Sequence, residues 1–239
     1  MILKRYKKNF AHSYTFGVFP TLELLTHRVQ DVLGVWLHPR ASQNSGVSKI
    51  EQLCQQNAIP IEIHEKNFNR LGARENDYAI GVLRKFSAPL DAAANHLVLV
   101  NPGSRGNLGT IIRAMLGFGF YDLAVIEPAA DIFHPDVLRA AMGALFQLRF
   151  EHFADFNAYQ NAHSQNIYVL MTDGVKPLNK VDFQTPFGLV FGNESSGLPP
   201  EFHAIGTSLR IPQSGAIDSL NLSIAVGVTL YQASLAQVD

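Results

Sequence analysis

Three stretches of this sequence place polar side chains in small-residue loops, each directly after a short apolar run that predicts a buried strand. The first stretch carries Asn107 and, six residues later, Arg113; the second carries Glu194; the third carries Ser219 and Asn221. The planar guanidinium of an arginine suits a ligand phosphate, because it can donate two parallel hydrogen bonds. These residue types therefore favour a site that binds and aligns a phosphate-containing ligand.

Each of these side chains also has a purely structural explanation. Asn107 is placed to cap a helix predicted over 108–118, and Arg113 lies off the apolar stripe of that helix, facing either solvent or a ligand. Glu194 is either solvated or held by backbone amides in its glycine-rich turn. Asn221 either caps the last helix or lines a site, and Ser219 or its neighbour Asp218 is a second cap candidate for a helix beginning near Leu220.

Strand and helix patterns alternate across the second part of the chain. Strands are expected near 97–101, 122–127, 167–171, 187–192 and 208–211, and helices near 108–118, 135–145, 155–163 and 217–235. This alternation predicts an α/β fold with a mainly parallel sheet and helices on both faces. Ligands bind such sheets at the carboxyl ends of the strands, so the three polar loops are expected to gather at one edge.

The predicted helix over 217–235 is apolar nearly all the way round. Solvent can face neither of its aliphatic sides, and the sheet of its own chain can cover only one of them. We therefore expect a symmetric homodimer with this helix at its centre.

The first part of the chain predicts a separate small α/β/α unit. Helices are expected over 19–26 and 48–56, and strands over 32–37, 59–63 and 78–83. Residues 68–76 are interpreted as a loop in which Arg70 and Arg74 lie beside Phe68, an arrangement that could hold RNA phosphates and stack a base, or could be an ordinary charged loop. The weakly patterned residues 87–95 are interpreted as a linker, which gives domains over 1–90 and 91–239.

Charge is distributed unevenly between these two predicted domains. Residues 1–90 hold 12 Lys and Arg against 7 Asp and Glu, whereas residues 91–239 hold 7 against 13. A basic first domain suits attraction of phosphates, although solvated surface charge would give the same count.

The order and spacing of the three loops resemble the signature motifs of the SpoU/TrmH class of SPOUT RNA 2'-O-ribose methyltransferases. The resemblance covers roughly residues 95–235. It rests on Asn107 with Arg113, then Gly192-x-Glu194-x-x-Gly197-Leu198, then Ile211-Pro212 followed by Ser219-Leu220-Asn221. The first domain is similar, more loosely, to the ribosomal-protein-like RNA-binding domain found in many enzymes of this class.

This resemblance implies transfer of a methyl group from S-adenosylmethionine to a ribose 2'-hydroxyl in rRNA or tRNA. It also implies a C-terminal trefoil knot and a site to which two chains contribute. Carried over by position, the residues around the transfer site are Arg113, Asn107, Glu194, Ser219 and Asn221. The cofactor is expected against Thr172, Asp173, Gly174, Gly192, Ile211 and Leu220, and RNA against Arg70, Arg74 and Arg105.

Two other functions remain open on the sequence. A catalytically silent RNA-binding relative would need a broken motif, and none is visible. A dinucleotide-binding site is suggested by Gly103, Gly106 and Gly109 before a helix with Glu127 after the next strand, but the G-x-G-x-x-G spacing is not met.

The composition argues against several further classes. No apolar run is long enough to cross a bilayer, no Cys/His cluster has the spacing of a metal site, and a lone Cys54 cannot form an intrachain disulfide. We expect a cytoplasmic protein without a metal, and a buried Cys54.

Overall fold

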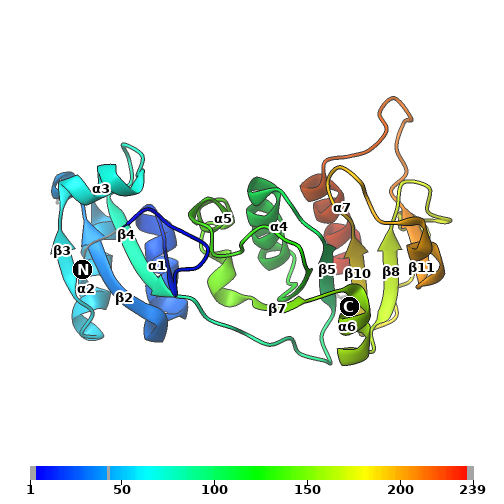
Figure 1. The fold of residues 1–239 in the computed structure, drawn as a ribbon, viewed down its shortest axis with the longest axis horizontal. Helices are drawn as coiled ribbons and strands as arrows, with labels where there is room; N and C mark the ends of the chain where they lie inside the picture. Colours follow the sequence, from blue (N-terminus) through cyan, green and yellow to red (C-terminus); the bar gives the residue numbers. More distant parts are fainter. Residues whose placement is uncertain (1–3, 42–43, 236–239) are drawn as a thin grey trace. The chain divides into compact units, whose positions relative to one another are not determined.

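The computed structural model describes residues 4–41 and 44–235. The chain divides into two compact units (Figure 1), the first formed by residues 1–86 with 131–147 and the second by residues 87–130 with 148–239. The predicted boundary near residue 90 lies close to the first crossing. Residues 131–147, however, were predicted within the second domain and pack with the first unit, so the chain passes between the units three times.

The first unit contains a four-stranded sheet in the order β1-β4-β2-β3. Its strands are β1 (His12–Tyr14), β2 (Val32–Leu37), β3 (Ile61–Ile63) and β4 (Ala79–Arg84). β4 pairs antiparallel with β1 and β2, and β3 pairs parallel with β2 at the edge. The predicted strand over 32–37 is confirmed to the residue, whereas the three-residue β1 gave no sequence signal long enough to predict.

The first unit also contains the helices α1 (Val18–His27), α2 (Ser45–Gln56) and α3 (Glu65–Leu71). Cys54 lies on α2 in the core and is fully buried, as predicted, and burial raises the pKa of its thiol to about 11. The loop predicted over 68–76 is wrong in its first half, because Phe68 and Leu71 anchor α3 to the core and Gly72 ends that helix in the left-handed conformation.

The segment 131–147 forms α5 (Pro135–Ala141) and the 3-10 turn η3 (Ala144–Gln147). Its apolar residues Val137 and Leu138 are buried, α5 contacts β1, and η3 contacts α1. Arg139 on α5 donates to both carboxylate oxygens of the buried Asp77 at 3.1 and 3.0 Å. A fragment starting at residue 91 would therefore lack the surface that covers this segment.

The second unit is built on a seven-stranded sheet, and all of its strand pairs are parallel. The order is β7-β6-β5-β10-β8-β11-β9. The strands are β5 (His96–Val100), β6 (Asp122–Ile126), β7 (Arg149–Phe153), β8 (Asn166–Leu170), β9 (Lys176–Pro177), β10 (Phe187–Phe191) and β11 (Thr207–Arg210). The five predicted strands are confirmed, and the two that were not predicted, β7 and β9, are the two edges.

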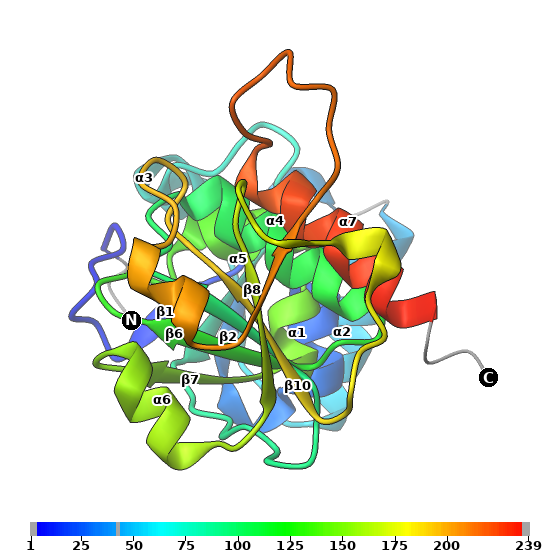
Figure 2. The ribbon, with the colours of Figure 1, turned by 90° about the vertical axis from the view of Figure 1, so that its right-hand side faces the viewer.

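Helices cover both faces of this sheet (Figure 2). α6 (Phe156–Ala162) and the turn η5 (Pro200–Ala204) pack on one face around Val98, Val169 and Val190. α4 (Arg105–Gly117) and α7 (Leu222–Leu235) pack against each other on the opposite face, and the turn η4 (Leu178–Lys180) lies beside α7. The predicted α/β architecture is thus confirmed.

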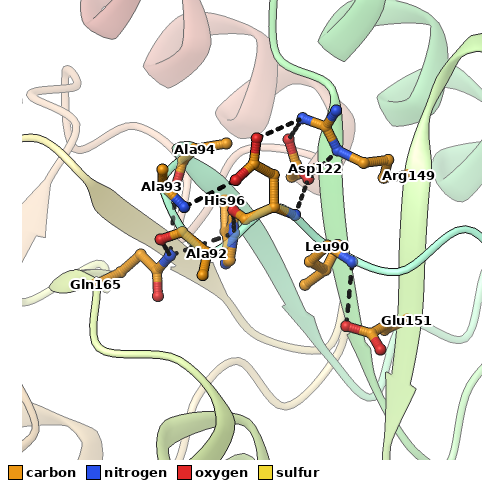
Figure 3. Close-up of polar contacts among 10 residues, drawn as sticks. Leu90, Ala92, Ala93, Ala94, His96, Asp122, Arg149, Glu151 and Gln165 are labelled. Atoms are coloured by element: carbon orange, nitrogen blue, oxygen red, sulfur yellow. Dashed lines mark hydrogen bonds and ion pairs between the residues drawn. The ribbon is translucent and has the colours of Figure 1, made fainter.

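A polar network joins the amino ends of β6 and β7 to the segment that precedes β5 (Figure 3). The Arg149 guanidinium donates to both oxygens of Asp122 at 2.6 Å, and the backbone N–H of Asp91 donates to Asp122 at 2.9 Å. Gln165 Nε2 donates to the carbonyl of Ala92 at 3.0 Å. These bonds hold the end of the predicted 87–95 linker firmly to the second unit.

Candidate active site

The polar loops meet because the strands that carry them are neighbours. Strands β5, β10, β8 and β11 lie side by side in that order, and the loops after all four emerge at the carboxyl edge of the parallel sheet. The loop over 211–221 projects beyond the strand ends (Figures 1 and 2). The predicted gathering of the three loops at one edge is therefore confirmed.

A cavity of about 330 Å³ lies among the loops that follow β8, β10 and β11. Its lining mixes apolar strand ends with small polar loop residues: Leu170, Met171, Thr172, Phe191, Gly192, Asn193, Glu194, Ser195, Ser196, Gly197, Ile211, Gln213, Asp218, Ser219, Leu220, Leu222 and Ala225. A lining that combines apolar surface with convergent polar groups is typical of a small-molecule site.

Glu194 fixes the loop after β5 to the loop after β10. Its Oε2 accepts from the backbone N–H of Gly103 at 3.0 Å, and its Oε1 accepts from the backbone N–H of Ser104 at 3.0 Å and from Asn107 Nδ2 at 3.3 Å. Burial acts to raise the pKa of the Glu194 carboxyl, but these hydrogen bonds and one from its own backbone N–H outweigh burial and lower the pKa below 4.5. The carboxylate is held by backbone amides, as one of the two sequence interpretations proposed.

The third loop joins the same network through its asparagine. Asn221 Nδ2 donates to Asn107 Oδ1 at 3.1 Å, and Asn221 Oδ1 accepts from the backbone N–H and the hydroxyl of Ser223 at 2.9 and 2.7 Å. The donors therefore run in one direction, from Ser223 through Asn221 and Asn107 to Glu194, which fixes the orientation of both amides. All three polar loops are thus tied into one hydrogen-bonded chain.

Two helix starts differ from the prediction. α4 begins at Arg105, and its cap is Ser104, whose hydroxyl accepts from the backbone N–H of Asn107 at 3.3 Å. Asn107 lies in the first turn, which frees its side chain to reach Glu194 and Asn221. A serine is as good a cap as an asparagine, so the Pro-Gly-Ser run was the signal that could have located this start.

α7 begins at Leu222 and not near Leu220. Asn221 occupies the cap position, since its Oδ1 accepts from the backbone N–H of Ser223. Asp218 and Ser219 belong to the exposed loop and line the cavity instead. Asn221 consequently fulfils both sequence alternatives, because it caps the helix and belongs to the site network.

Of the predicted cofactor residues, Thr172, Gly192, Ile211 and Leu220 line the cavity, whereas Asp173 and Gly174 are not among its lining residues. Asp173 pairs with His203 at 3.2 Å. Gly174 is required by the fold, because a Cβ there would lie 2.3 Å from the backbone carbonyl carbon of Leu209. Gly192 also packs against backbone. A Cβ at position 192 would lie 2.2 Å from the carbonyl carbon of Gly197, so there is no room for a side chain at this point of the cavity wall.

The predicted arginines lie outside the cavity lining. Arg113 is exposed on α4 and makes no polar contact with any residue in 4–41 or 44–235. Arg105 is exposed at the start of α4, whereas Arg70 and Arg74 are exposed in the first unit. The aromatic partner proposed for these two is not available for stacking, because Phe68 is only 3% exposed.

One further residue of the site was not predicted from the sequence. Asn193 Nδ2 donates to the carbonyl of Asn101 at 2.8 Å, and Asn193 Oδ1 accepts from the backbone N–H of Ser195 at 2.9 Å. Asn101 has a φ of 53°, a left-handed conformation that asparagine tolerates better than most residues. Asn193 thereby stabilises the turn that sends the first loop toward Glu194, and an asparagine after a buried strand was its only sequence signal.

A profile of the SpoU rRNA Methylase family matches residues 94–231, which include the whole of this site. The chain belongs to the SpoU rRNA methylase family. The three loops with Asn107, Glu194 and Asn221 lie within the matched region, so the predicted resemblance is confirmed. Of the first unit, the match includes only the segment 131–147.

Individual relatives of the SpoU family agree with this assignment. The chain is 32% identical over 145 residues to a tRNA/rRNA methyltransferase of Synechocystis whose function is uncharacterized, a match covering 59% of this chain and 53% of the relative. It is also 32% identical over 141 residues to a 23S rRNA uridine 2'-O-methyltransferase of Streptomyces viridochromogenes, covering 55% and 49%. The chain thus spans about half the length of these curated relatives.

A solved structure extends the likeness to both units. The AdoMet-bound rRNA methyltransferase of Sinorhizobium meliloti has a TM-score of 0.81 and 24% identity to this chain, with 96% of this chain and 89% of that one covered. At this identity the comparison shows a shared fold. Within residues 4–41 and 44–235, no helix is long and apolar enough to span a membrane, and no three His, Cys, Asp or Glu residues form a group that could hold a metal ion.

Proposed function

We propose that this chain transfers a methyl group from S-adenosylmethionine to a ribose 2'-hydroxyl of rRNA or tRNA. The observation that carries the proposal is the hydrogen-bonded chain from Asn221 through Asn107 to Glu194, which joins all three SpoU loops beside one cavity. Family membership and the names of the relatives support the reaction type. We also propose a cytoplasmic location, which the proposed substrates support.

The cavity fits the proposed cofactor in size and chemistry. Its volume of about 330 Å³ falls in the range of roughly 300–1,000 Å³ that small-molecule sites occupy. Leu170, Phe191 and Leu222 offer apolar surface for a planar base, and Gly192 adds backbone to the lining. Thr172 and Ser219 add hydroxyls at the rim. When bound, S-adenosylmethionine supplies an electrophilic methyl group on a sulfonium.

Glu194 is best suited to a positioning role. Its two oxygens already accept from two backbone N–H groups and from the side-chain amides of Asn107 and Asn193, and its lowered pKa makes it a weak base. We therefore assign it to holding Gly103, Ser104 and Asn107 in place. The proton of the ribose hydroxyl must leave by another group.

Arg113 is the proposed contact to RNA. A guanidinium stays protonated in proteins, so Arg113 cannot accept the hydroxyl proton. It can donate two parallel hydrogen bonds to a backbone phosphate and stabilise the negative charge that develops on the attacking oxygen. Its exposed side chain, free of polar partners within 4–41 and 44–235, is available for such a contact.

The apolar face of α7 supports a homodimer. Leu222, Val226 and Leu230 are buried within the chain, whereas Ile224, Val228, Tyr231 and Leu235 are 55%, 41%, 54% and 50% exposed. These four exposed residues recur every three or four positions and form one stripe along the helix. A second copy of this chain would bury the stripe and bring the neighbouring α4, with Arg113, close to the partner's cavity.

Strand order supports the proposed trefoil knot. β11 is inserted between β8 and β9, although β8 and β9 are joined by the short connection over 171–175. Gly174 in that connection packs directly on the backbone of Leu209 in β11. A knot is the expected result when a later strand and its following loop pass inside an earlier connection.

The first unit is the proposed RNA-binding domain, with Arg70 and Arg74 exposed on it and Arg105 exposed on the second unit. Its positive charge favours association with RNA at low salt, and binding is expected to weaken as salt rises.

Two measurements test the proposal. Calorimetric titration with S-adenosylmethionine should show a single site, and labelled S-adenosylmethionine should transfer methyl to ribose 2'-oxygens of total RNA. Gly192→Ala should weaken cofactor binding at least about tenfold, because its Cβ would lie 2.2 Å from the Gly197 backbone. Gly117→Ala is the control, since a Cβ there meets nothing within 4 Å.

The outcomes separate the alternatives. Cofactor and RNA binding without transfer would indicate a silent relative, and absence of cofactor binding would refute the proposal. Mapping 2'-O-methyl positions in RNA from cells with and without the gene would identify the substrate.

A further inference from the structure

The cavity of the second unit is lined by acidic side chains and by no basic ones. Among the residues within 4–41 and 44–235 that line it, Glu194 and Asp218 are the only two with ionisable side chains, and both are carboxylates. A cleft lined by charge of one sign attracts a ligand of the opposite sign. The cavity therefore suits a cationic ligand better than a neutral ligand of the same shape.

One of the two carboxylates is already committed to the fold. The oxygens of Glu194 accept at 3.0 to 3.4 Å from backbone or side-chain N–H groups of Gly103, Ser104, Asn107 and Asn193. Hydrogen bonds of this kind compensate the charge of a carboxylate with the positive ends of N–H dipoles. Glu194 consequently has little charge left to act on a ligand.

The other carboxylate is uncompensated. Asp218 is exposed in the loop over 211–221, and its side chain makes no hydrogen bond or ion pair with any residue in 4–41 or 44–235. It precedes Asn221 by three positions, and the Asn221 amide donates to Asn107 in the network of the proposed transfer site. The loop that carries the transfer-site asparagine thus also brings a free negative charge to the cavity.

We propose that Asp218 makes the cavity prefer S-adenosylmethionine to the product of the reaction, S-adenosylhomocysteine. In the transfer, the bond between sulfur and methyl breaks, the ribose oxygen forms a bond to the methyl carbon and loses its proton, and sulfur keeps the electron pair. The sulfonium thereby becomes an uncharged thioether, while the adenosine and amino-acid groups stay the same.

A free carboxylate distinguishes these two molecules by charge alone. Its Coulomb attraction stabilises the sulfonium form and is absent for the thioether, so product release becomes easier once the methyl group has left. Asp218 is accordingly a residue that determines specificity for the charge of the cofactor. The inference rests on the proposed function, since it takes S-adenosylmethionine as the ligand of this cavity.

Calorimetric titration of the full chain with each of the two compounds tests the role of Asp218. Asp218→Asn removes the charge and keeps the shape of the side chain. We expect the Kd for S-adenosylmethionine to rise about fivefold, the upper end for an exposed ion pair, and the Kd for S-adenosylhomocysteine to change by less than about twofold. Because salt screens exposed charges, the fivefold effect should shrink between about 0.05 and about 0.5 M salt.

Two further variants separate charge from shape and from position. Asp218→Glu keeps the charge and should keep the preference for S-adenosylmethionine. Asp182→Asn, at an exposed carboxylate of the second unit outside the cavity lining, is the matched control and should change neither affinity. Circular dichroism should show that Asp218→Asn is folded, because the Asp218 side chain has no polar partner to lose among the described residues.

Three results would overturn the inference. Equal weakening of both compounds in Asp218→Asn would place the carboxylate on the ammonium group that they share. Unchanged affinity for both compounds, with slower methyl transfer, would make Asp218 a candidate proton acceptor instead. Unchanged affinity without any effect on transfer would leave Asp218 outside the site.

The inference and the proposed function fail in different ways. All three of these results leave the proposed function intact, because the wild-type chain still binds S-adenosylmethionine. A wild-type chain that binds neither compound would refute both.

Discussion

Replacing Glu194 by glutamine tests whether this carboxylate holds the first loop of the site. Glutamine keeps the shape but has one oxygen, so it can accept from only one of the two backbone N–H groups, those of Gly103 and Ser104, that now lie 3.0 Å from the carboxylate. The other N–H would face an amide nitrogen. A hydrogen bond to a charged group contributes roughly 1.5–3 kcal/mol, and Glu194 is only partly buried. We therefore expect the substitution to lower the free energy of unfolding by about 2 kcal/mol at neutral pH.

The pH dependence of this effect has a definite sign. The folded-state pKa of Glu194 is lower than the ordinary value of 4.5. Its charge therefore stabilises the fold above pH 4.5, and that stabilisation is lost as the pH falls through the lower folded-state pKa. Glutamine cannot titrate, so the difference in unfolding free energy between the two proteins should shrink as the pH is lowered below 4.5.

Urea denaturation followed by circular dichroism measures this difference at several pH values. The transition of the second unit is identified as the one that S-adenosylmethionine moves to higher urea. Glu201→Gln, at an exposed carboxylate on η5, is the control. It should change neither the free energy of unfolding nor the dependence of that free energy on pH. A Glu194→Gln effect that is the same at about pH 7 and below pH 4, or smaller than about 0.5 kcal/mol throughout, would refute the anchoring role.

Four further outcomes are expected. Arg113→Ala should abolish methyl transfer while calorimetry shows unchanged affinity for S-adenosylmethionine; equal loss of both would place Arg113 on the cofactor. Val228→Glu puts a charge on a 41% exposed position of α7, and light scattering should show monomers that remain folded. Arg149→Met leaves the 1% exposed carboxylate of Asp122 without its ion-pair partner. Urea denaturation should show a free energy of unfolding lower by about 3 kcal/mol, the low end of what breaking a buried ion pair costs, because the Arg149 side chain is 41% exposed. Cys54, buried and with a pKa raised to about 11, should react with iodoacetamide at about pH 8 only as fast as the first unit opens.

Each of these has a clear contrary result. A wild-type protein that is monomeric and fully active would show that no second chain contributes to the site. An Arg149→Met protein as stable as the wild type would mean that Asp122 is satisfied by backbone groups alone. Rapid alkylation of Cys54 in the native protein would contradict its place in the core.

The sequence alone determined the strands and helices that carry strong periodic patterns. Central strands such as β10, and β5 after His96, are apolar because both faces of a parallel sheet are covered, and this run of residues is visible without a structure. The edge strand β7 contains Arg149, Glu151 and His152, so the apolar signal disappears where one side meets solvent. Edge strands were accordingly the ones that escaped prediction.

The sequence also determined that the three polar loops would form one site. Each loop follows a strand, and parallel strands place the loops that follow them on the same edge whatever their order. Only the tertiary structure decided how the side chains meet. The bond between Asn107 and Asn221 joins residues 114 positions apart, and it depends on the strand order and on α4 packing against α7. No local pattern encodes such a contact.

The helix starts show the limit of local rules. Ser104 and Asn107 are both good caps, and the choice between them depends on Glu194, whose oxygens hold the N–H groups of Gly103 and Ser104. The same applies to residues 131–147, which lie in sequence between β6 and β7 of the second unit but pack on the first unit because that unit covers their apolar side chains. Local propensity fixes which elements form; the free energy of burying their apolar faces, which depends on the whole chain, decides where each one packs.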